Sequence, residues 1–411
     1  MPSSRPRTAS AVSLSVTAAA AAIALAGCVP NNPTGAALSV KISDAACDVS
    51  ASTAPAGAIK FTLENTGTDV NEFEIFADDQ LRIVGEKENV TPGQTVDYVV
   101  ELQPGTYYTA CKFQQIGSPI GVAEFTVTGE AVAVSEDEQA RIDQAVANYI
   151  SYVKSQTEEL LPATKAFVAA YEAGDDETAR SLFASTRAYY ERIEPTAEAF
   201  GDLDPKIDYR EVDAVAEGLD WTGFHRIEKD LWAPKPGDVN SDGTDALQDW
   251  APSTPEQRKQ FGDQLVADVQ SLYDQVHAAD FTVGIADISN GAIGLLDEVS
   301  SGKITGEEDW WSHTDLEDFA ANVDGAYVAF GVVKDIAASK GEEGAQLVDT
   351  IEREFGALRG LLAEYGSFDA GFTPYDEVTD AQRQELSNAV NALAEPLSQL
   401  THTVLGVPEA S

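Results

Sequence analysis

Histidine and methionine are scarce in this 411-residue chain, which has four His and a single Met, Met1. Between Leu38 and Gly129 there is no His at all. A blue-copper site combines two His and a Cys with an axial Met, so it cannot be assembled in that region. The HExxH motif of zinc metalloproteases is also absent from the sequence.

Basic residues are few as well, with 26 Lys plus Arg against 69 Asp plus Glu and a formal net charge of -43. Such a chain repels nucleic acid and anionic headgroups, while it concentrates cations at its surface. The composition therefore predicts no nucleic-acid partner and favours a cationic ligand. Strong acidity also serves solubility or adaptation to salt.

The apolar run near the N-terminus, from about residue 11 to 26, is too short for a comfortable membrane span. It follows Arg5 and Arg7, the plan of a secretory signal. It ends in LAGC, which resembles the bacterial lipobox and predicts lipidation of Cys28. We thus expect a signal peptide over 1–27, a tether over 28–37 and anchoring on the outer face of the cytoplasmic membrane. Cleavage at an ordinary signal site is the alternative.

Two further cysteines, Cys47 and Cys111, remain for other roles. In an extracytoplasmic compartment a disulfide between them is favoured, and a thiolate metal site is the alternative.

The pattern of apolar and polar residues changes once along the sequence, near residue 135. Over 38–130, short segments alternate apolar and polar residues between Gly, Pro and Asn, which predicts an antiparallel β-sandwich. Over 135–408 the apolar residues recur at intervals of three and four residues, and Ser135 is a possible N-cap of the first helix. This pattern predicts a large all-α domain of two helical bundles. The expected helices cover 176–200, the region around Trp221, 255–278, 286–300, 314–338, 341–365 and 379–405.

His225 and Glu228, in the stretch WTGFHRIEKDLW, are the first candidates for a metal site. Residues three apart on a helix emerge on one face, so both side chains can reach the same ion. An imidazole with a carboxylate suits iron, zinc or manganese. An ordinary buried or surface ion pair is the alternative.

Other acidic residues could complete the set of ligands around such an ion. Glu191, Glu194 and Glu198 form one stripe, which Pro195 is expected to kink or restart, and a solvated face is the alternative. A turn with Glu308, Asp309 and His313 could contribute too, or could only cap the next helix. In the sandwich, the alternation of strands places Glu72 with Glu74, and Glu86 with Glu88.

Several long motifs resemble one known family. YYERIEPTAEAFGDLDPKIDYR, GLDWTGFHRIEKDLW and TGEEDWWSHTDLEDFAANVDGA are similar to the EfeO-type iron-uptake lipoproteins, whose helical domain is imelysin peptidase-like with a GxHxxE motif. Here that motif is Gly223, His225 and Glu228. The segments DAACDVSAS, ENVTPG and LQPGTYYTACKF resemble the cupredoxin-like domain of the longer members.

The resemblance implies an extracytoplasmic iron-binding protein that works with a ferrous-iron permease and a haem peroxidase of the dye-decolorising type. It implies His225 and Glu228 as metal ligands, with Glu191, Glu194, Glu308, Asp309 and His313 as weaker candidates. In the sandwich it implies metal positions at Cys47, Cys111, Glu72, Glu74, Glu86 and Glu88. Iron is the expected ion, with copper or zinc as alternatives.

We expect no enzymatic activity from this chain, because the protease motif is incomplete. Two enzymatic alternatives stay open. One is a metallopeptidase of the imelysin type, and the other is a ferroxidase or electron-transfer module in the sandwich.

Overall fold

A computed structural model describes residues 36–78, 80, 83–114, 119–130, 135–248, 250–301 and 303–407. The predicted signal peptide, the lipidation site Cys28 and residues 28–35 of the predicted tether lie outside this range. Within it, no helix combines the length and the apolar character needed to cross a bilayer.

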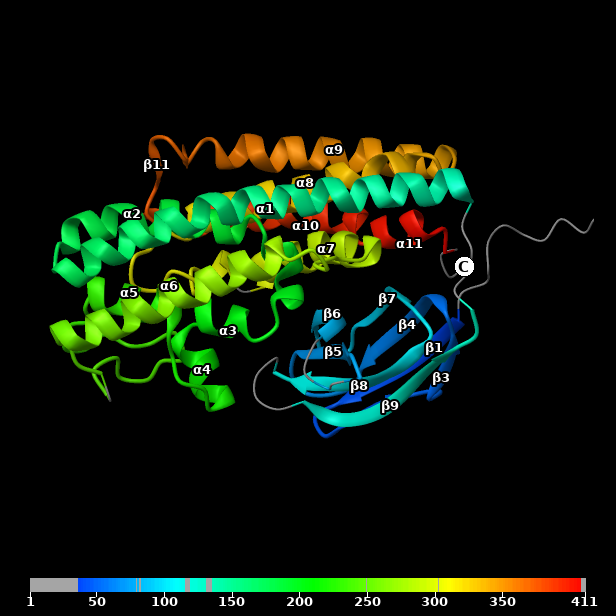
Figure 1. Cartoon of the computed structure of the whole chain (residues 1–411), viewed down its shortest axis with the longest axis horizontal. Helices are drawn as coiled ribbons and strands as arrows, with labels where there is room; N and C mark the ends of the chain where they lie inside the picture. The colour runs from blue at the N-terminus through cyan, green and yellow to red at the C-terminus, as the bar shows by residue number, and fades with distance from the viewer. Residues whose placement is uncertain are drawn as a thin grey trace, which may run out of the picture. The chain divides into compact units, whose positions relative to one another are not determined.

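The first part of the described chain is a β-sandwich (Figure 1). One sheet has the strand order β2-β1-β4-β7, built from β1 (Ala36–Ser43), β2 (Ala46–Val49), β4 (Gly57–Asn65) and β7 (Thr95–Leu102). The other has the order β3-β9-β8-β5-β6, built from β3 (Thr53–Pro55), β9 (Ile120–Thr128), β8 (Gly105–Phe113), β5 (Asn71–Phe76) and β6 (Ile83–Val90). Phe61 packs between the sheets, with its ring centroid 5.1 Å from that of Phe73 and 5.8 Å from that of Phe125.

The sandwich differs in one respect from the antiparallel arrangement that the sequence predicts. β1 pairs with β4 and β3 pairs with β9 in parallel, while the other pairs are antiparallel. Alternation of apolar residues fixes which face of a strand is buried, but it is the same for both directions of pairing. Parallel neighbours here are strands separated by other strands in the chain, so the direction depends on the crossover connections.

The second part is helical. Its long elements are α1 (Glu136–Ala173), α2 (Asp176–Glu191), α6 (Pro255–His277), α7 (Ile285–Ser301), α8 (Asp315–Ala338), α9 (Glu342–Leu362) and α10 (Asp380–Leu397). Shorter ones are η1 (Glu194–Phe200), α3 (Leu203–Ile207), α4 (Glu211–Glu217), α5 (Gly223–Leu231), η2 (Lys303–Thr305) and α11 (Leu400–Leu405). A small hairpin, β10 (Gly366–Ser367) with β11 (Gly371–Phe372), and η3 (Tyr375–Glu377) join α9 to α10.

The helices pack as two groups that share one helix. α1 contacts α2 and α6, α9 contacts α10, and α8 contacts α2 and α1 as well as α7 and α9 (Figure 1). One continuous apolar core runs through both groups, from Ala145 to Val404. The predicted pair of bundles is therefore built around α8.

Local signals in the sequence explain where several helices begin and end. The Ser135 side chain accepts a hydrogen bond from the Glu138 N–H and caps α1, as expected. α2 ends at Glu191, and Pro195 lies in the first turn of η1, so the predicted helix over 176–200 is interrupted there. A proline cannot donate the backbone hydrogen bond that a continuing helix needs.

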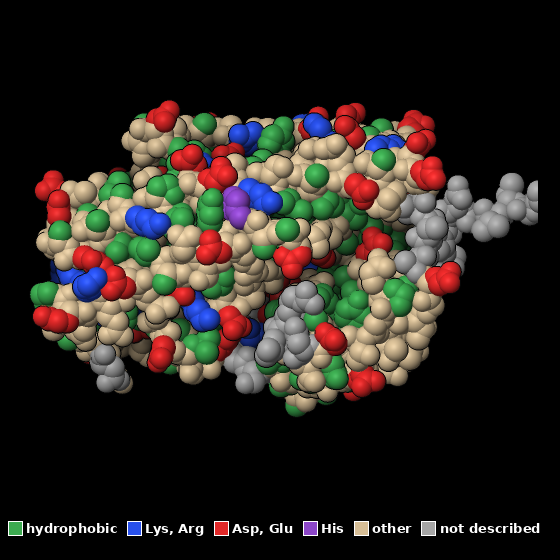
Figure 2. Space-filling view, in the orientation of Figure 1, with side chains coloured by type: hydrophobic (Ala, Val, Ile, Leu, Met, Phe, Trp, Pro, Cys, Tyr) green, Lys and Arg blue, Asp and Glu red, His purple; other side chains and the backbone are tan. Residues whose placement is uncertain are grey.

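Acidic side chains are spread over the molecular surface. Figure 2 shows Asp and Glu over the whole visible face, with fewer Lys and Arg between them. This agrees with the net charge of -43.

Candidate metal centre

The start of α5 lies directly against the end of α3, which brings His225 close to Asp208. Gly223 has a φ of 85°, and a Cβ built on it would lie 2.3 Å from the Ile207 carbonyl oxygen. Only glycine combines this left-handed conformation with so close a backbone approach. The glycine of the GxHxxE motif thus allows the close approach that places His225 beside Asp208, the residue after Ile207.

The His225 and Glu228 side chains meet, as their spacing on a helix predicts. His225 Nδ1 lies 3.1 Å from Glu228 Oε2, and both side chains are buried. The other oxygen of Glu228 accepts hydrogen bonds from the backbone N–H groups of Trp311 (3.0 Å) and Ser312 (2.7 Å). Glu228 is therefore fixed at both oxygens and holds the imidazole ring in one orientation.

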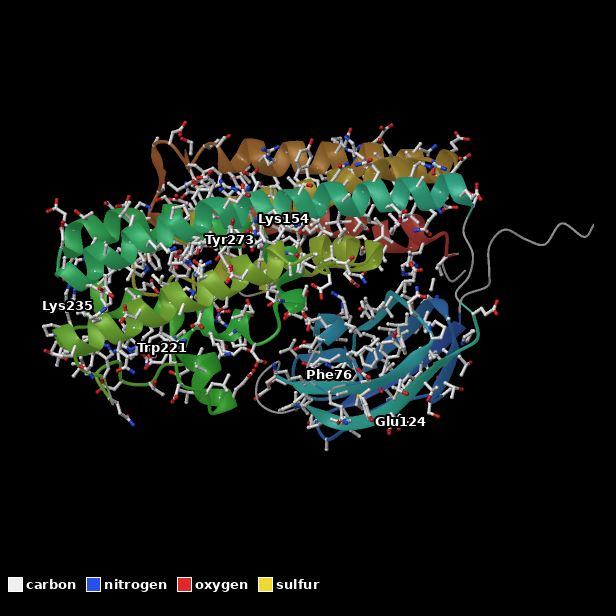
Figure 3. The ribbon with its side chains drawn as sticks, viewed as in Figure 1. Phe76, Glu124, Lys154, Trp221, Lys235 and Tyr273 are labelled. Carbon is white, nitrogen blue, oxygen red and sulfur yellow. A yellow bond between two sulfur atoms is a disulfide. The ribbon has the colours of Figure 1, made fainter. Side chains whose placement is uncertain are left out.

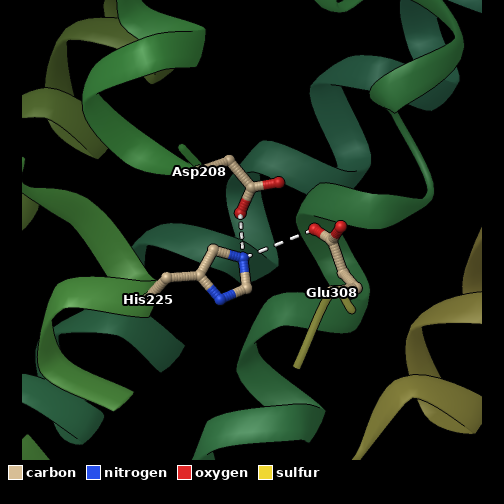
Figure 4. Close-up of side chains that lie close together, drawn as sticks. All are labelled: Asp208, His225 and Glu308. Carbon is tan, nitrogen blue, oxygen red and sulfur yellow. Dashed lines mark ion pairs between the residues drawn. The ribbon is translucent and has the colours of Figure 1, made fainter. Parts of the chain in front are cut away.

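The second ring nitrogen of His225 points between two carboxylates (Figure 4). Nε2 lies 3.4 Å from Glu308 Oε1 and 3.8 Å from Asp208 Oδ1. This nitrogen is buried and has no hydrogen-bond partner among the described residues. It is a buried polar atom that faces two acceptors.

These three atoms have the chemistry and spacing of a metal-ligand group. They lie within 4.8 Å of one another. Two ligands that are each about 2.1 Å from an ion are about 3.0 Å apart at a right angle and about 4.2 Å apart on opposite sides. The two distances from Nε2 fall in this range, and imidazole with carboxylate oxygens is a donor set that suits iron.

A second group of possible ligands shares the same histidine. It consists of His225, Glu228 and Asp309, with His225 Nδ1 3.8 Å from Asp309 Oδ1. The Asp309 oxygen is buried without a hydrogen-bond partner in the described part of the chain. Asp309 comes from the turn before α8, and its other oxygen accepts a hydrogen bond from the Thr314 hydroxyl.

The acidic cluster contains its own cations. Arg187 on α2 is completely buried and pairs with the carboxylates of Glu191, Asp208, Glu308, Asp309 and Asp318. Lys303 on η2 pairs with Glu191 at 3.0 Å and with Glu194 at 2.8 Å. Asn322 donates to the same two glutamates.

The pKa values of the cluster reflect burial opposed by these charges. For His225, burial and the Arg187 charge lower the pKa, but the adjacent carboxylates of Glu228, Glu308 and Asp208 outweigh them and raise it to about 9. Burial raises the pKa of Glu308, yet Lys303 and His225 reverse this and hold it well below its usual range. Burial raises the pKa of Asp315 to about 7.

Not all residues predicted for the site reach His225. Glu191 and Glu194 contact Lys303 and Asn322 instead, so their stripe faces the cations of the chain. His313 has a φ of 60°, and its backbone bonds to Asp309 and Tyr375. It belongs to neither ligand group around His225 among the described residues.

Asp208, Arg187 and Asp318 are part of the cluster but were not singled out in the sequence. Asp208 lies inside one of the family-like segments, DLDPKIDYR, which is the signal that could have identified it. Arg187 lies four residues before Glu191, so an (i, i+4) ion pair on the acidic stripe was visible in the sequence. Nothing in the spacing indicates that this arginine is buried.

A small pocket borders the cluster. The half-buried side chains of Trp221, Trp310 and Trp311 line this pocket together with His225, Glu228 and Glu308. Trp221, labelled in Figure 3, precedes α5 and donates a hydrogen bond from its indole nitrogen to the Tyr209 carbonyl. An ion pair between Arg210 and Glu307, 3.0 Å long, lies along this pocket.

The sandwich holds a separate group of carboxylates. Glu72 and Glu74 on β5 and Glu86 on β6 offer oxygens within 4.8 Å of one another, and Glu74 pairs with Glu86 across the two strands. Burial, together with the Glu74 charge, raises the pKa of Glu72 to about 7. Burial also raises the pKa of Glu88 to about 8. Glu88 is outside the three-residue group.

Cys47 on β2 and Cys111 on β8 form a disulfide that links the two sheets. The favoured prediction for this pair agrees with the structure. The positions that the resemblance implies as metal ligands thus carry no thiolate in this form, because a bonded sulfur cannot act as one.

Comparison with known proteins gives matches to both parts of the chain. Residues 145–400 match the family model described as imelysin, and residues 12–122 match that of the cupredoxin-like domain. The iron uptake system component EfeO of Escherichia coli O157:H7 is 37% identical over 372 residues, which is 90% of this chain and 91% of that protein. The proteins of the same name from Escherichia coli strain K12 and Shigella flexneri show the same identity and coverage.

Proposed function

The chain belongs to the EfeO-type branch of the imelysin family, and from this premise we propose that it captures iron outside the cytoplasm and delivers it to a membrane ferrous-iron permease. The observation that carries the proposal is the buried His225 Nε2, which faces Asp208 and Glu308 at ligand spacing. The same system would include a haem peroxidase of the dye-decolorising type. The lipid anchor at Cys28 would hold the protein at the outer face of the membrane.

We assign the roles as follows. His225 Nε2, Asp208 and Glu308 bind the ion, and Glu228 holds the imidazole through Nδ1. A carboxylate-rich group with one imidazole exchanges hard cations more readily than a closed cysteine cage does. Reversible binding is what delivery to a permease requires.

Titration of the purified protein with ferrous iron under argon tests these roles. We expect His225→Ala to weaken binding by about a hundredfold or more, and Asp208→Asn and Glu308→Gln to weaken it too. Glu228→Gln should cost about ten- to a hundredfold, as for other residues that orient a ligand. Asp213→Asn is the matched control, since Asp213 pairs with Arg210 and not with His225.

Two results would contradict the assignment. If none of the four ligand-region variants alters iron binding, the cluster is not the site. If Glu228→Gln and Asp309→Asn abolish binding while Asp208→Asn has no effect, the ion occupies the second group, on the Nδ1 side of the ring.

The carboxylates of the sandwich are a second candidate site for the same ion. Glu72, Glu74 and Glu86 converge without a histidine, and carboxylate oxygens favour harder cations such as ferric iron. Their raised pKa values reflect burial of mutually repelling charges, which a cation would neutralise.

A further inference from the structure

Arg187 shares its carboxylate partners with His225, atom by atom. Asp208 Oδ1 accepts from Arg187 Nη1 and also faces His225 Nε2. Glu308 Oε1 lies 3.3 Å from Arg187 Nη2 and 3.4 Å from His225 Nε2. The two oxygens that would bind an ion on the imidazole are thus the ones that the guanidinium already contacts.

The same holds on the other side of the ring. Asp309 Oδ1 lies 3.5 Å from Arg187 Nε and 3.8 Å from His225 Nδ1. Whichever group holds the ion, it shares at least one oxygen with Arg187.

The guanidinium is held in place by more than the shared oxygens. Arg187 Nε donates to Asp318 Oδ2 at 3.0 Å, and Nη2 donates to Glu191. Phe183 and Phe224 lie 5.8 and 5.9 Å from the guanidinium carbon. The side chain has no exposed surface, so water does not screen its charge.

From this geometry we propose that Arg187 is an internal counter-cation that competes with iron for Asp208 and Glu308 and keeps the affinity low enough for release. The proposal rests on the proposed function and adds a residue that sets the strength of binding without being a ligand. Without iron, Arg187 neutralises carboxylates that would otherwise repel each other. With iron bound, it shares their charge and repels the ion.

Replacing Arg187 by a neutral side chain should therefore act in the opposite direction to replacing a ligand. We expect Arg187→Met to bind ferrous iron about tenfold or more tightly, because one unit charge a few ångströms from the ion is removed from a weakly screened interior. Affinity is measured under argon by competition with a chromophoric ferrous chelator. In the absence of iron the variant should unfold at a lower temperature, and iron should raise that temperature more than in wild type.

Two further variants keep the test decisive where Arg187→Met does not fold. Arg187→Met combined with Asp318→Asn removes one charge of each sign, and Asp318 is in neither ligand group around His225. It should also bind iron more tightly than wild type. Arg187→Lys retains a charge but cannot span five carboxylates, so its affinity should fall between those of wild type and Arg187→Met.

Arg226→Met is the matched control. Arg226 follows His225 on α5 and pairs with Asp230 at 3.0 Å, and Asp230 does not contact His225 in the described structure. Its iron affinity should equal that of wild type.

Weaker or unchanged iron binding in both the Arg187→Met and the double variant would overturn the inference. If Arg187 only supported the ligands, its removal would weaken iron binding, and if Arg187 had no influence on the ion, its removal would leave iron binding unchanged. Failure of the proposed function would look different. In that case wild type would bind no iron, or would bind it independently of His225.

Discussion

The two nitrogens of His225 have separate partners, and this determines how the residue must handle its proton. Nδ1 is next to Glu228, and Nε2 is next to Asp208 and Glu308. With its pKa raised to about 9, the ring is protonated at neutral pH. A metal ion can bind Nε2 only after that nitrogen loses its proton, while Nδ1 can continue to donate to Glu228.

Ferrous iron binding at neutral pH should therefore release close to one proton from His225. The affinity of the protein for ferrous iron should rise about tenfold per pH unit between about 7 and 9 and then level off. Calorimetry under argon in two buffers of different ionisation enthalpy measures the release. His277→Gln is the control, because it removes an imidazole that stacks on Tyr273, and the number of protons released should be unchanged in this variant. Affinity that does not vary with pH over this interval would contradict the assigned ligand.

The same pKa has a consequence for folding, with the sign fixed by its direction. Because the folded value of about 9 exceeds the ordinary value of 6.5, protonated His225 contributes stability that is complete below about pH 6.5. That contribution is lost as the pH rises through about 9.

At the residue scale, part of the site follows from the sequence. The spacing of His225 and Glu228 places both on one helix face, and the structure brings them together. The contributions of Asp208 and Arg187 could not be derived in this way, because they come from other elements and depend on how α2, α3 and α5 pack. The metal-binding roles themselves remain predictions.

At the scale of elements, the contact between α3 and α5 determines the site geometry. Gly223→Ala should lower the free energy of unfolding by about 1–3 kcal/mol, since the new Cβ combines left-handed strain with a clash against the Ile207 carbonyl. It should also weaken iron binding, because relief of the clash moves His225 away from Asp208. Thermal unfolding and iron titration measure the two effects.

The variant Gly218→Ala distinguishes the effect of left-handed backbone strain from the effect of a steric clash. Gly218 ends α4 with a φ of 70°, and a Cβ there would have no neighbour within 4 Å. This variant should lose about 1 kcal/mol and retain wild-type iron affinity. If Gly223→Ala bound iron as well as Gly218→Ala does, the close approach would not be what positions the ligands.

Most elements could be predicted from the sequence, but their pairing could not. Apolar periodicity gave the strands and long helices, and Pro195 indicated the break after α2. The predicted helix over 379–405 is divided into α10 and α11, with Pro396 in the last turn of α10. Parallel pairing of β1 with β4 depends on the chain path and leaves no trace in alternation.

At the scale of the whole molecule, the excess of acidic residues should make stability depend on salt. A net charge of -43 implies self-repulsion that screening reduces. We expect the unfolding temperature to rise by several degrees between about 10 mM and about 0.5 M sodium chloride. Potassium chloride should act equally, because screening depends on ionic strength. A constant or falling unfolding temperature would show that local ion pairs outweigh the repulsion.

Composition alone favours a cationic ligand, but it does not indicate where such a ligand would bind. The domain boundaries, the lipid anchor and the partners remain predictions that rest on motifs and on family resemblance.

The disulfide between Cys47 and Cys111 has a practical consequence for measuring how many ions the protein holds. Recombinant material made in a reducing cytosol would carry two free thiols in the core of the sandwich, where Cys47 and Cys111 lie between the two sheets. Such thiols could bind soft metals that the oxidised protein does not, and so inflate the apparent stoichiometry. Intact-mass analysis of the oxidation state should accompany every metal count.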